Sequence, residues 1–142
     1  MAIIIHFNLE NHLKKTILIF FLLLSSLYAK VTHEYTSQKT LDSKIPVVDI
    51  RTPGEWKETG LLKNSIPIMF FNEKGGYDVN GFLKELNAKV DTSKPFALIC
   101  RTGSRTRVLS GFLSQEYNYD VTNLKGGLVY VKQLRLPILP YK

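Results

Sequence analysis

The chain contains a single cysteine, Cys100, and the residues that follow it are those of a reactive thiol site. They are polar, cationic or glycine: Arg101, Thr102, Gly103, Ser104 and Arg105. The thiolate is the nucleophilic form of cysteine, and neighbouring cations and helix N-termini favour that form. We therefore expect Cys100 to be a low-pKa nucleophile in a partly exposed, electropositive loop, with Arg101 and Arg105 favouring the thiolate.

The segments on both sides of this loop predict how it is held. Residues 95–99 form an apolar run typical of a buried strand. After the loop, apolar residues recur at helical spacing: Val108, Leu109, Phe112 and Leu113. A strand, a loop with glycine and hydroxyl residues, and then a helix place backbone N–H groups around an anion. A cysteine that ends a strand can also be a small core side chain, but the polar loop favours the reactive interpretation.

The run from Cys100 to Arg105 resembles the active-site loop of rhodanese-like sulfurtransferases, whose common form is Cys-Arg-x-Gly-x-Arg. Two other segments resemble the same family, in the same order along the chain. They are Val-Val-Asp-Ile-Arg-Thr-Pro-Gly-Glu-Trp at residues 47–56 and Leu-Lys-Gly-Gly at residues 124–127. The resemblance implies a rhodanese-like α/β fold, a small parallel β-sheet flanked by helices on both faces.

The resemblance also implies an enzyme of the thiosulfate sulfurtransferase type. The Cys100 thiolate would take a sulfane sulfur from an anionic donor, such as thiosulfate or a polysulfide. The resulting persulfide would pass that sulfur to a thiophilic acceptor, a thiol or cyanide-like group. The substrate would be bound by the loop, mainly through its N–H groups: Arg101, Thr102, Gly103, Ser104 and Arg105. A left-handed backbone at Gly103 would let the loop curl around the sulfur.

The length of the loop separates this chemistry from phosphate chemistry on the same fold. Rhodanese-like phosphatases and arsenate reductases have five residues between the cysteine and the arginine, which would place arginine at position 106. This chain has Thr106 there and closes the loop earlier, at Arg105. The shorter loop suits one sulfur atom better than a tetrahedral phosphate, so phosphatase activity is disfavoured.

Asp49 and Arg51 follow a short apolar strand and are expected near the site, because open α/β sheets bind ligands at the carboxyl ends of their strands. The resemblance implies that both are structural, with Arg51 pairing with Glu55 or another acid. Trp56 is predicted to be a core residue. The sequence predicts no cofactor and no metal, because one cysteine and scattered histidines do not make a zinc site.

The coarse pattern predicts one domain over residues 30–142, with strands and helices in alternation. Expected strands lie at 31–35 on an edge, 45–50 in the centre, 65–71, 96–99 and 120–124. Pro67 indicates an edge or irregular position for the third of these. Expected helices begin near Thr52, at Asp78 as N-cap, near Arg105 and near Leu128.

Residues 1–29 have the composition of a secretory signal peptide: two lysines, an apolar run over 16–24 and a small residue, Ala29, at the end. An uncleaved membrane anchor is the alternative interpretation of this segment. The sequence therefore predicts a periplasmic or secreted protein. The formal net charge is +7, but outside the arginines near the loop the cations are scattered, so we expect no nucleic-acid partner. The macromolecular partners that fit an exported sulfurtransferase are a sulfur-accepting protein and, only if the leader is uncleaved, a membrane.

A non-enzymatic module is the alternative function. Such a module would carry persulfide or sense redox state without turnover. The complete Cys-x-x-Gly-x-Arg loop favours the enzyme.

Overall fold

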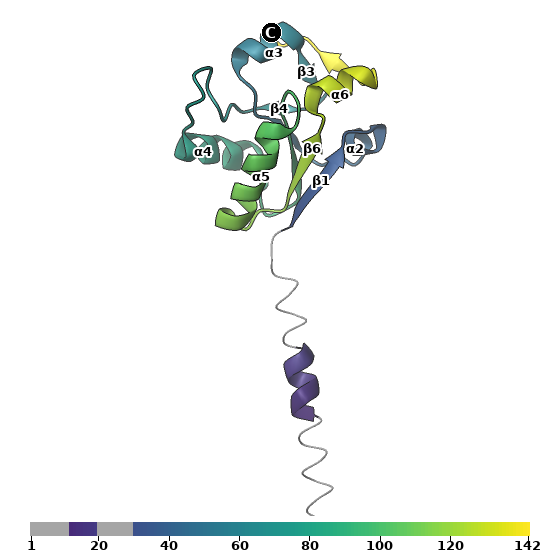
Figure 1. Ribbon diagram of the computed structural model, residues 1–142, viewed down its shortest axis with the longest axis vertical. Coiled ribbons are helices and arrows are strands. Elements are labelled where there is room, and N and C mark those ends of the chain that lie inside the picture. Colours follow the sequence, from purple (N-terminus) through teal and green to yellow (C-terminus); the bar gives the residue numbers. More distant parts are fainter. Residues whose placement is uncertain (1–11, 20–29) are drawn as a thin grey trace, which may run out of the picture.

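The computed structural model describes residues 12–19 and 30–142 (Figure 1). Its main element is a five-stranded sheet with the order β1-β6-β5-β2-β4, in which every pairing is parallel. The strands are β1 (Val31–Tyr35), β2 (Val47–Asp49), β4 (Ile66–Pro67), β5 (Phe96–Ile99) and β6 (Val121–Lys125). The predicted small parallel sheet is thereby confirmed.

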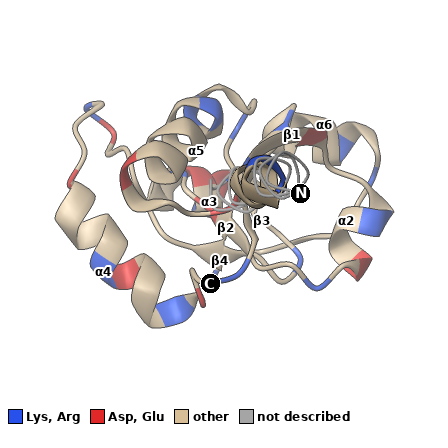
Figure 2. Ribbon diagram, turned by 90° about the horizontal axis from the view of Figure 1, so that it is seen from below, with Lys and Arg blue, Asp and Glu red and all other residues tan. Residues whose placement is uncertain are grey.

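Helices cover both faces of this sheet, as predicted (Figure 2). One face is covered by α4 (Val79–Lys89) and α5 (Ser104–Tyr117), the other by α2 (Gln38–Asp42) and α6 (Gly127–Gln133). Side chains alternate along each strand, so Val48 and Leu98 join the core under α4 and α5. Val47 and Ala97 join the second core, under α2 and α6. Two separate hydrophobic clusters therefore pack against the two faces of the central strands, because those strands are apolar on both faces.

The edge positions also agree with the prediction. Within the described residues, β1 and β4 are the outer strands of the sheet. β4 is shorter than the predicted segment 65–71 because Pro67 has no N–H to give to a ladder. The chain nevertheless stays beside β2, since Ile68 and Phe70 donate to the carbonyls of Asp49 and Ile50.

The helix starts follow from local sequence. α3 (Pro53–Thr59) has Thr52 as N-cap, and Asp78 caps α4. α5 begins at Ser104 and buries Leu109 and Leu113. The expected apolar stripe on this helix is wrong at Val108, which is 68% exposed, because that position turns away from the sheet.

Two features were not predicted. A short helix, α2, begins at a Ser37 capping box. An antiparallel pair is formed by β3 (Leu61–Leu62) and β7 (Ile138–Leu139), which joins the end of the α3 region to the C-terminal segment.

Most of the predicted leader, residues 1–11 and 20–29, lies outside the described residues, and residues 12–19 are helical. Among the described helices, none combines the length and hydropathy that crossing a membrane requires. The leader remains a prediction from sequence.

Candidate active site

The site forms where two neighbouring strands end. β2 and β5 pair in parallel with Asp49 opposite Ile99, and the Ile50 N–H donates to the Ile99 carbonyl at 3.0 Å. Each strand then turns into a helix, β2 into α3 and β5 into α5. The two turns, residues 50–52 and 100–103, consequently lie side by side at the carboxyl edge of the sheet, where open α/β sheets bind ligands.

Cys100 lies at the bottom of the second turn. Its Sγ accepts a hydrogen bond from the Gly103 N–H at 3.1 Å and lies 3.5 Å from the Thr106 hydroxyl. The side chain is fully buried and belongs to the core beneath α5. The expectation of a partly exposed thiol is therefore wrong, because the loop folds back over its own sulfur.

The loop nevertheless favours the thiolate. Burial alone would raise the pKa of the Cys100 thiol, but hydrogen bonds outweigh it and lower the pKa. The groups responsible are the Thr106 hydroxyl, when its proton points at the sulfur and not at Asn123, and the backbone N–H groups of Thr106, Thr102 and Gly103. Cys100 is thus a buried thiol whose anion is stabilised by peptide dipoles and by whatever share of the Thr106 hydroxyl proton is turned toward it.

Gly103 makes this curl. Its φ of +88° lies in the left-handed region, as expected, and it is the N-cap of α5. A Cβ at this position would lie 3.0–3.1 Å from backbone atoms of residues 124–126. No side chain caps α5, so donors of its first turn remain available to the sulfur.

The Gly-Gly turn holds the loop from the other side. A Cβ on Gly127 would lie 2.4 Å from the Cys100 carbonyl oxygen. The close approach lets the N–H groups of Leu128 and Val129 donate to the carbonyls of Cys100 and Arg101, at 2.9 and 3.1 Å. The Leu-Lys-Gly-Gly segment therefore fixes the backbone of the loop that begins at Cys100.

Arg105 is held by a carboxylate. Its two terminal nitrogens donate to the two oxygens of Glu55 at 2.8 and 2.6 Å. The pKa of Arg105 is raised, mainly by this hydrogen bond and also by interaction with Cys100. From sequence we expect Arg105 to neutralise a bound anion. In the structure its guanidinium is already paired with the Glu55 carboxylate of α3, although it still interacts with Cys100.

Asp49 and Arg51 form a closed pair in the neighbouring turn. Arg51 donates to Asp49 through Nε at 2.9 Å and through NH2 at 2.8 Å, and both side chains are buried. Of the two partners expected for Arg51, an acid other than Glu55 is the one found, since Glu55 offers only its backbone carbonyl, at 3.3 Å. Trp56 is buried, as predicted, and donates from Nε1 to Asp49 at 3.2 Å.

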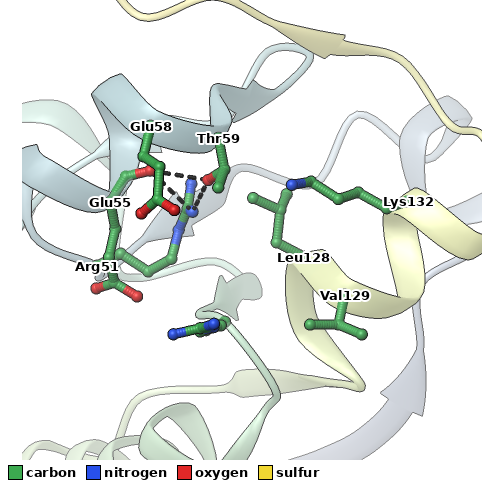
Figure 3. A pocket seen from close by; sticks show the side chains of 8 residues that line it. Arg51, Glu55, Glu58, Thr59, Leu128, Val129 and Lys132 are labelled. Atoms are coloured by element: carbon green, nitrogen blue, oxygen red, sulfur yellow. Dashed lines mark hydrogen bonds between the residues drawn. The ribbon is translucent and has the colours of Figure 1, made fainter.

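The other predicted loop residues are exposed. The Thr102 and Ser104 hydroxyls bond each other at 3.1 Å. Arg101 lines a hollow of about 200 Å³ between α3 and α6. Figure 3 shows Glu55, Glu58 and Thr59 on one side of this hollow and Leu128, Val129 and Lys132 on the other. Within residues 12–19 and 30–142, no group of three or more His, Cys, Asp or Glu side chains is placed to hold a metal ion.

Three residues of a hydrogen-bonded chain that ends beside the sulfur were missed as site residues. The Thr106 hydroxyl, beside Cys100, donates to Asn123 Oδ1 at 2.6 Å. Asn123 Nδ2 lies 3.1 Å from His33 Nδ1. Thr106 directly follows the motif Cys100–Arg105, and from sequence it is notable only because it is not an arginine. A buried, strand-borne Asn123 and an edge-strand His33 carry no local signal of proximity to Cys100.

Comparison with known proteins agrees with this geometry. A family model described as rhodanese-like domain matches residues 32–134. The uncharacterized protein RP600 of Rickettsia prowazekii (strain Madrid E) is 29% identical over 91 residues, which cover 61% of this chain and 72% of that protein.

Solved structures show the same fold. A rhodanese-related protein from Thermoplasma volcanium aligns with a TM-score of 0.57 at 23% identity, covering 79% of this chain and all of that one. Rv0390 from M. tuberculosis aligns with a TM-score of 0.57 at 17% identity, covering 69% of this chain and 80% of that one.

Proposed function

The chain belongs to the family of rhodanese-like domains, and from this premise we propose that it transfers sulfane sulfur through a persulfide on Cys100. Domains of this family are generally related to sulfur transfer. The proposal adds the nucleophile, the donor class and the acceptor class for this chain.

The observation that supports it most directly is the environment of the sulfur. Cys100 Sγ receives the Gly103 N–H at 3.1 Å and faces the first turn of an uncapped helix. Together these donors lower the pKa of a fully buried thiol. A cysteine that only fills the core needs no donors around its sulfur, because burial by itself keeps it as the neutral thiol.

The chemistry balances with thiosulfate as donor. The Cys100 thiolate attacks the outer sulfur, a new S–S bond forms, and sulfite leaves with the electron pair of the broken S–S bond. An acceptor such as cyanide then attacks the outer sulfur of the persulfide. Its S–S bond breaks and returns the electron pair to Cys100 as thiolate, which the loop donors stabilise as leaving group.

Phosphate chemistry is disfavoured by the same loop. Position 106, where a phosphatase of this fold would have arginine, holds a buried threonine whose hydroxyl is engaged with Asn123. The guanidinium of Arg105 is engaged with Glu55. The loop therefore lacks, at the position that distinguishes the two chemistries, the guanidinium that would surround a transferred phosphoryl group.

The experiment combines mass spectrometry and turnover. We expect thiosulfate to add one sulfur, about 32 Da, to the wild-type chain as a persulfide, and thiocyanate to form when cyanide follows. Cys100→Ser should lose both, with turnover at least about 100-fold lower. As matched control, the double variant Cys100→Ser, Ser93→Cys keeps one cysteine in the chain but places it at an exposed position, and it should stay as inactive as Cys100→Ser.

The outcomes separate the two functions. Persulfide formation without thiocyanate would favour the non-enzymatic carrier or redox module. Failure of thiosulfate and polysulfide alike to modify Cys100 would contradict sulfur transfer itself.

A further inference from the structure

A chain of three polar side chains connects the buried sulfur to the edge of the sheet. Thr106 lies 3.5 Å from Cys100 Sγ and donates to Asn123 Oδ1 at 2.6 Å. Asn123 Nδ2 lies 3.1 Å from His33 Nδ1. Thr106 and Asn123 are buried, whereas His33 is exposed on β1. The chain therefore runs from solvent to the nucleophile across two strands and a helix.

The donors and acceptors allow two arrangements. A neutral His33 is compatible with both, according to its tautomer, whereas the imidazolium form of His33 is compatible only with the second. An amide NH2 only donates, so the arrangement described above requires a neutral His33 that accepts at Nδ1. The Thr106 proton is then used on Asn123, and Thr106 can only accept from a Cys100 S–H. When His33 carries a proton on Nδ1, the Asn123 amide turns over to accept it. Asn123 Nδ2 then donates to Thr106, whose hydroxyl proton is free for the thiolate.

We propose that His33 and Asn123 are positioning residues for Cys100, so that protonation of His33 turns the Thr106 hydroxyl toward the sulfur and stabilises the thiolate. The proposal rests on the proposed function only in that the thiolate is the reacting species. A histidine changes its charge between about pH 5 and 8. Sulfur transfer would therefore keep its nucleophile ionised into mildly acidic conditions.

Other charges face His33 as well. His33 lines a second hollow, distinct from the one beside Arg101. Arg107 from α5 and Lys125 from β6 also line it, beside Thr102 and Ser104 of the loop. Arginine and lysine side chains keep their charge throughout pH 5–8. His33 is the imidazole among the residues that line this hollow.

Reciprocity provides the test, because two linked protonations must affect each other equally. Histidine NMR titrations of the full chain are compared in wild type and Cys100→Ser. We expect the serine variant to lower the His33 proton affinity by about threefold to tenfold, the range that one exchanged hydrogen bond supplies. His12, far along the chain in the helix at 12–19, serves as internal control and should not move.

Thr106→Val separates the hydrogen-bond chain from simple charge attraction, because it removes the hydroxyl and keeps both charges. In this background the effect of Cys100→Ser on His33 should fall by more than half. Thr106→Ser keeps the hydroxyl and should restore it. An effect of equal size in the Thr106→Val background, or no effect in wild type, would overturn the proposal.

A second measurement does not depend on Thr106 variants. The alkylation rate of Cys100, the single cysteine of the chain, is followed from pH 5 to 9. Wild type should deviate from one ionisation, by about threefold to tenfold in rate at the acidic end. His33→Gln, whose amide can donate or accept at any pH, should follow one ionisation. Superimposable profiles would contradict the coupling. Neither measurement needs a sulfur donor, so failure here is distinct from failure of sulfur transfer.

Discussion

The turns after β2 and β5 are neighbours, and their sequences are similar. They differ in what their backbone N–H groups bind. Both continue from a parallel strand into a helix, and both contain an arginine followed by a threonine, Arg51-Thr52 and Arg101-Thr102. In the first turn, Thr52 and Glu55 form a capping box that uses the N-terminal donors of α3. In the second, α5 has no side-chain cap, and its turn donates to the Cys100 sulfur instead.

The arginines differ in the same way. Arg51 is buried and satisfied by Asp49, Thr59 and the Gly60 carbonyl, whereas Arg101 is exposed at a hollow. A turn that satisfies all its own polar groups is architecture. A turn that leaves donors pointing at one atom is prepared for an anion there.

The largest effect should come from opening the closed turn. Asp49→Asn leaves the Arg51 guanidinium buried without its counter-charge, which lowers the free energy of unfolding by about 3–5 kcal/mol. Urea denaturation measures this. Glu85→Gln, in the exposed pair with Lys89, is the control and should change stability by about 0.3–0.5 kcal/mol. Equal losses for the two variants would mean that the Asp49–Arg51 pair is not structural.

A smaller effect is expected from closing the open turn. Gly103→Ala forces a left-handed residue against backbone atoms of residues 124–126, which costs about 1–3 kcal/mol. It should also slow alkylation of Cys100, because the Gly103 N–H moves away from the sulfur. Gly111→Ala, in the middle of α5 with no atom within 4 Å of an added Cβ, should instead stabilise by about 0.5–1 kcal/mol. Unchanged thiol reactivity in Gly103→Ala would show that the curl does not serve the thiolate.

The smallest effect concerns the link between the two turns. Burial alone would raise the pKa of Glu55, but the hydrogen bond from Arg105, the Thr52 N–H and nearby guanidiniums lower it overall. Glu55→Gln keeps the capping-box geometry and loses the charge, so it isolates the Arg105 pair. We expect a loss of about 1–2 kcal/mol at neutral pH.

The pH dependence of that loss has a defined sign. A carboxylate with a lowered pKa contributes stability above its unfolded-state pKa and loses it as the pH falls through its folded-state pKa. The difference between wild type and Glu55→Gln should therefore shrink as the solution is acidified below about pH 4. A difference that stays constant from pH 6 to pH 3 would assign the loss to packing.

Much of the fold was predictable because its signals are local. A few neighbouring residues are enough to predict the strands β2 and β5 from their apolar runs, the start of α4 from Asp78, and the breaks at the prolines. The turn that holds Cys100 is equally local: strand, cysteine, left-handed glycine and helix follow one another directly. The unpredicted elements α2 and β3–β7 are short, and the second depends on contact between segments far apart in the chain.

The sequence by itself therefore determined an alternating α/β chain with a thiol at a helix N-terminus, because covalent neighbours make that unit. Only the tertiary structure decided which partners the charged and hydroxyl side chains have. Glu55 reaches Arg105 from 50 positions away, and Asn123 joins Thr106 to His33, which lies 90 positions from it. These pairings follow from the strand order, which places β1 beside β6 and β5 beside β2. Strand order is set by burial of both faces of the sheet at once, and no short segment records it.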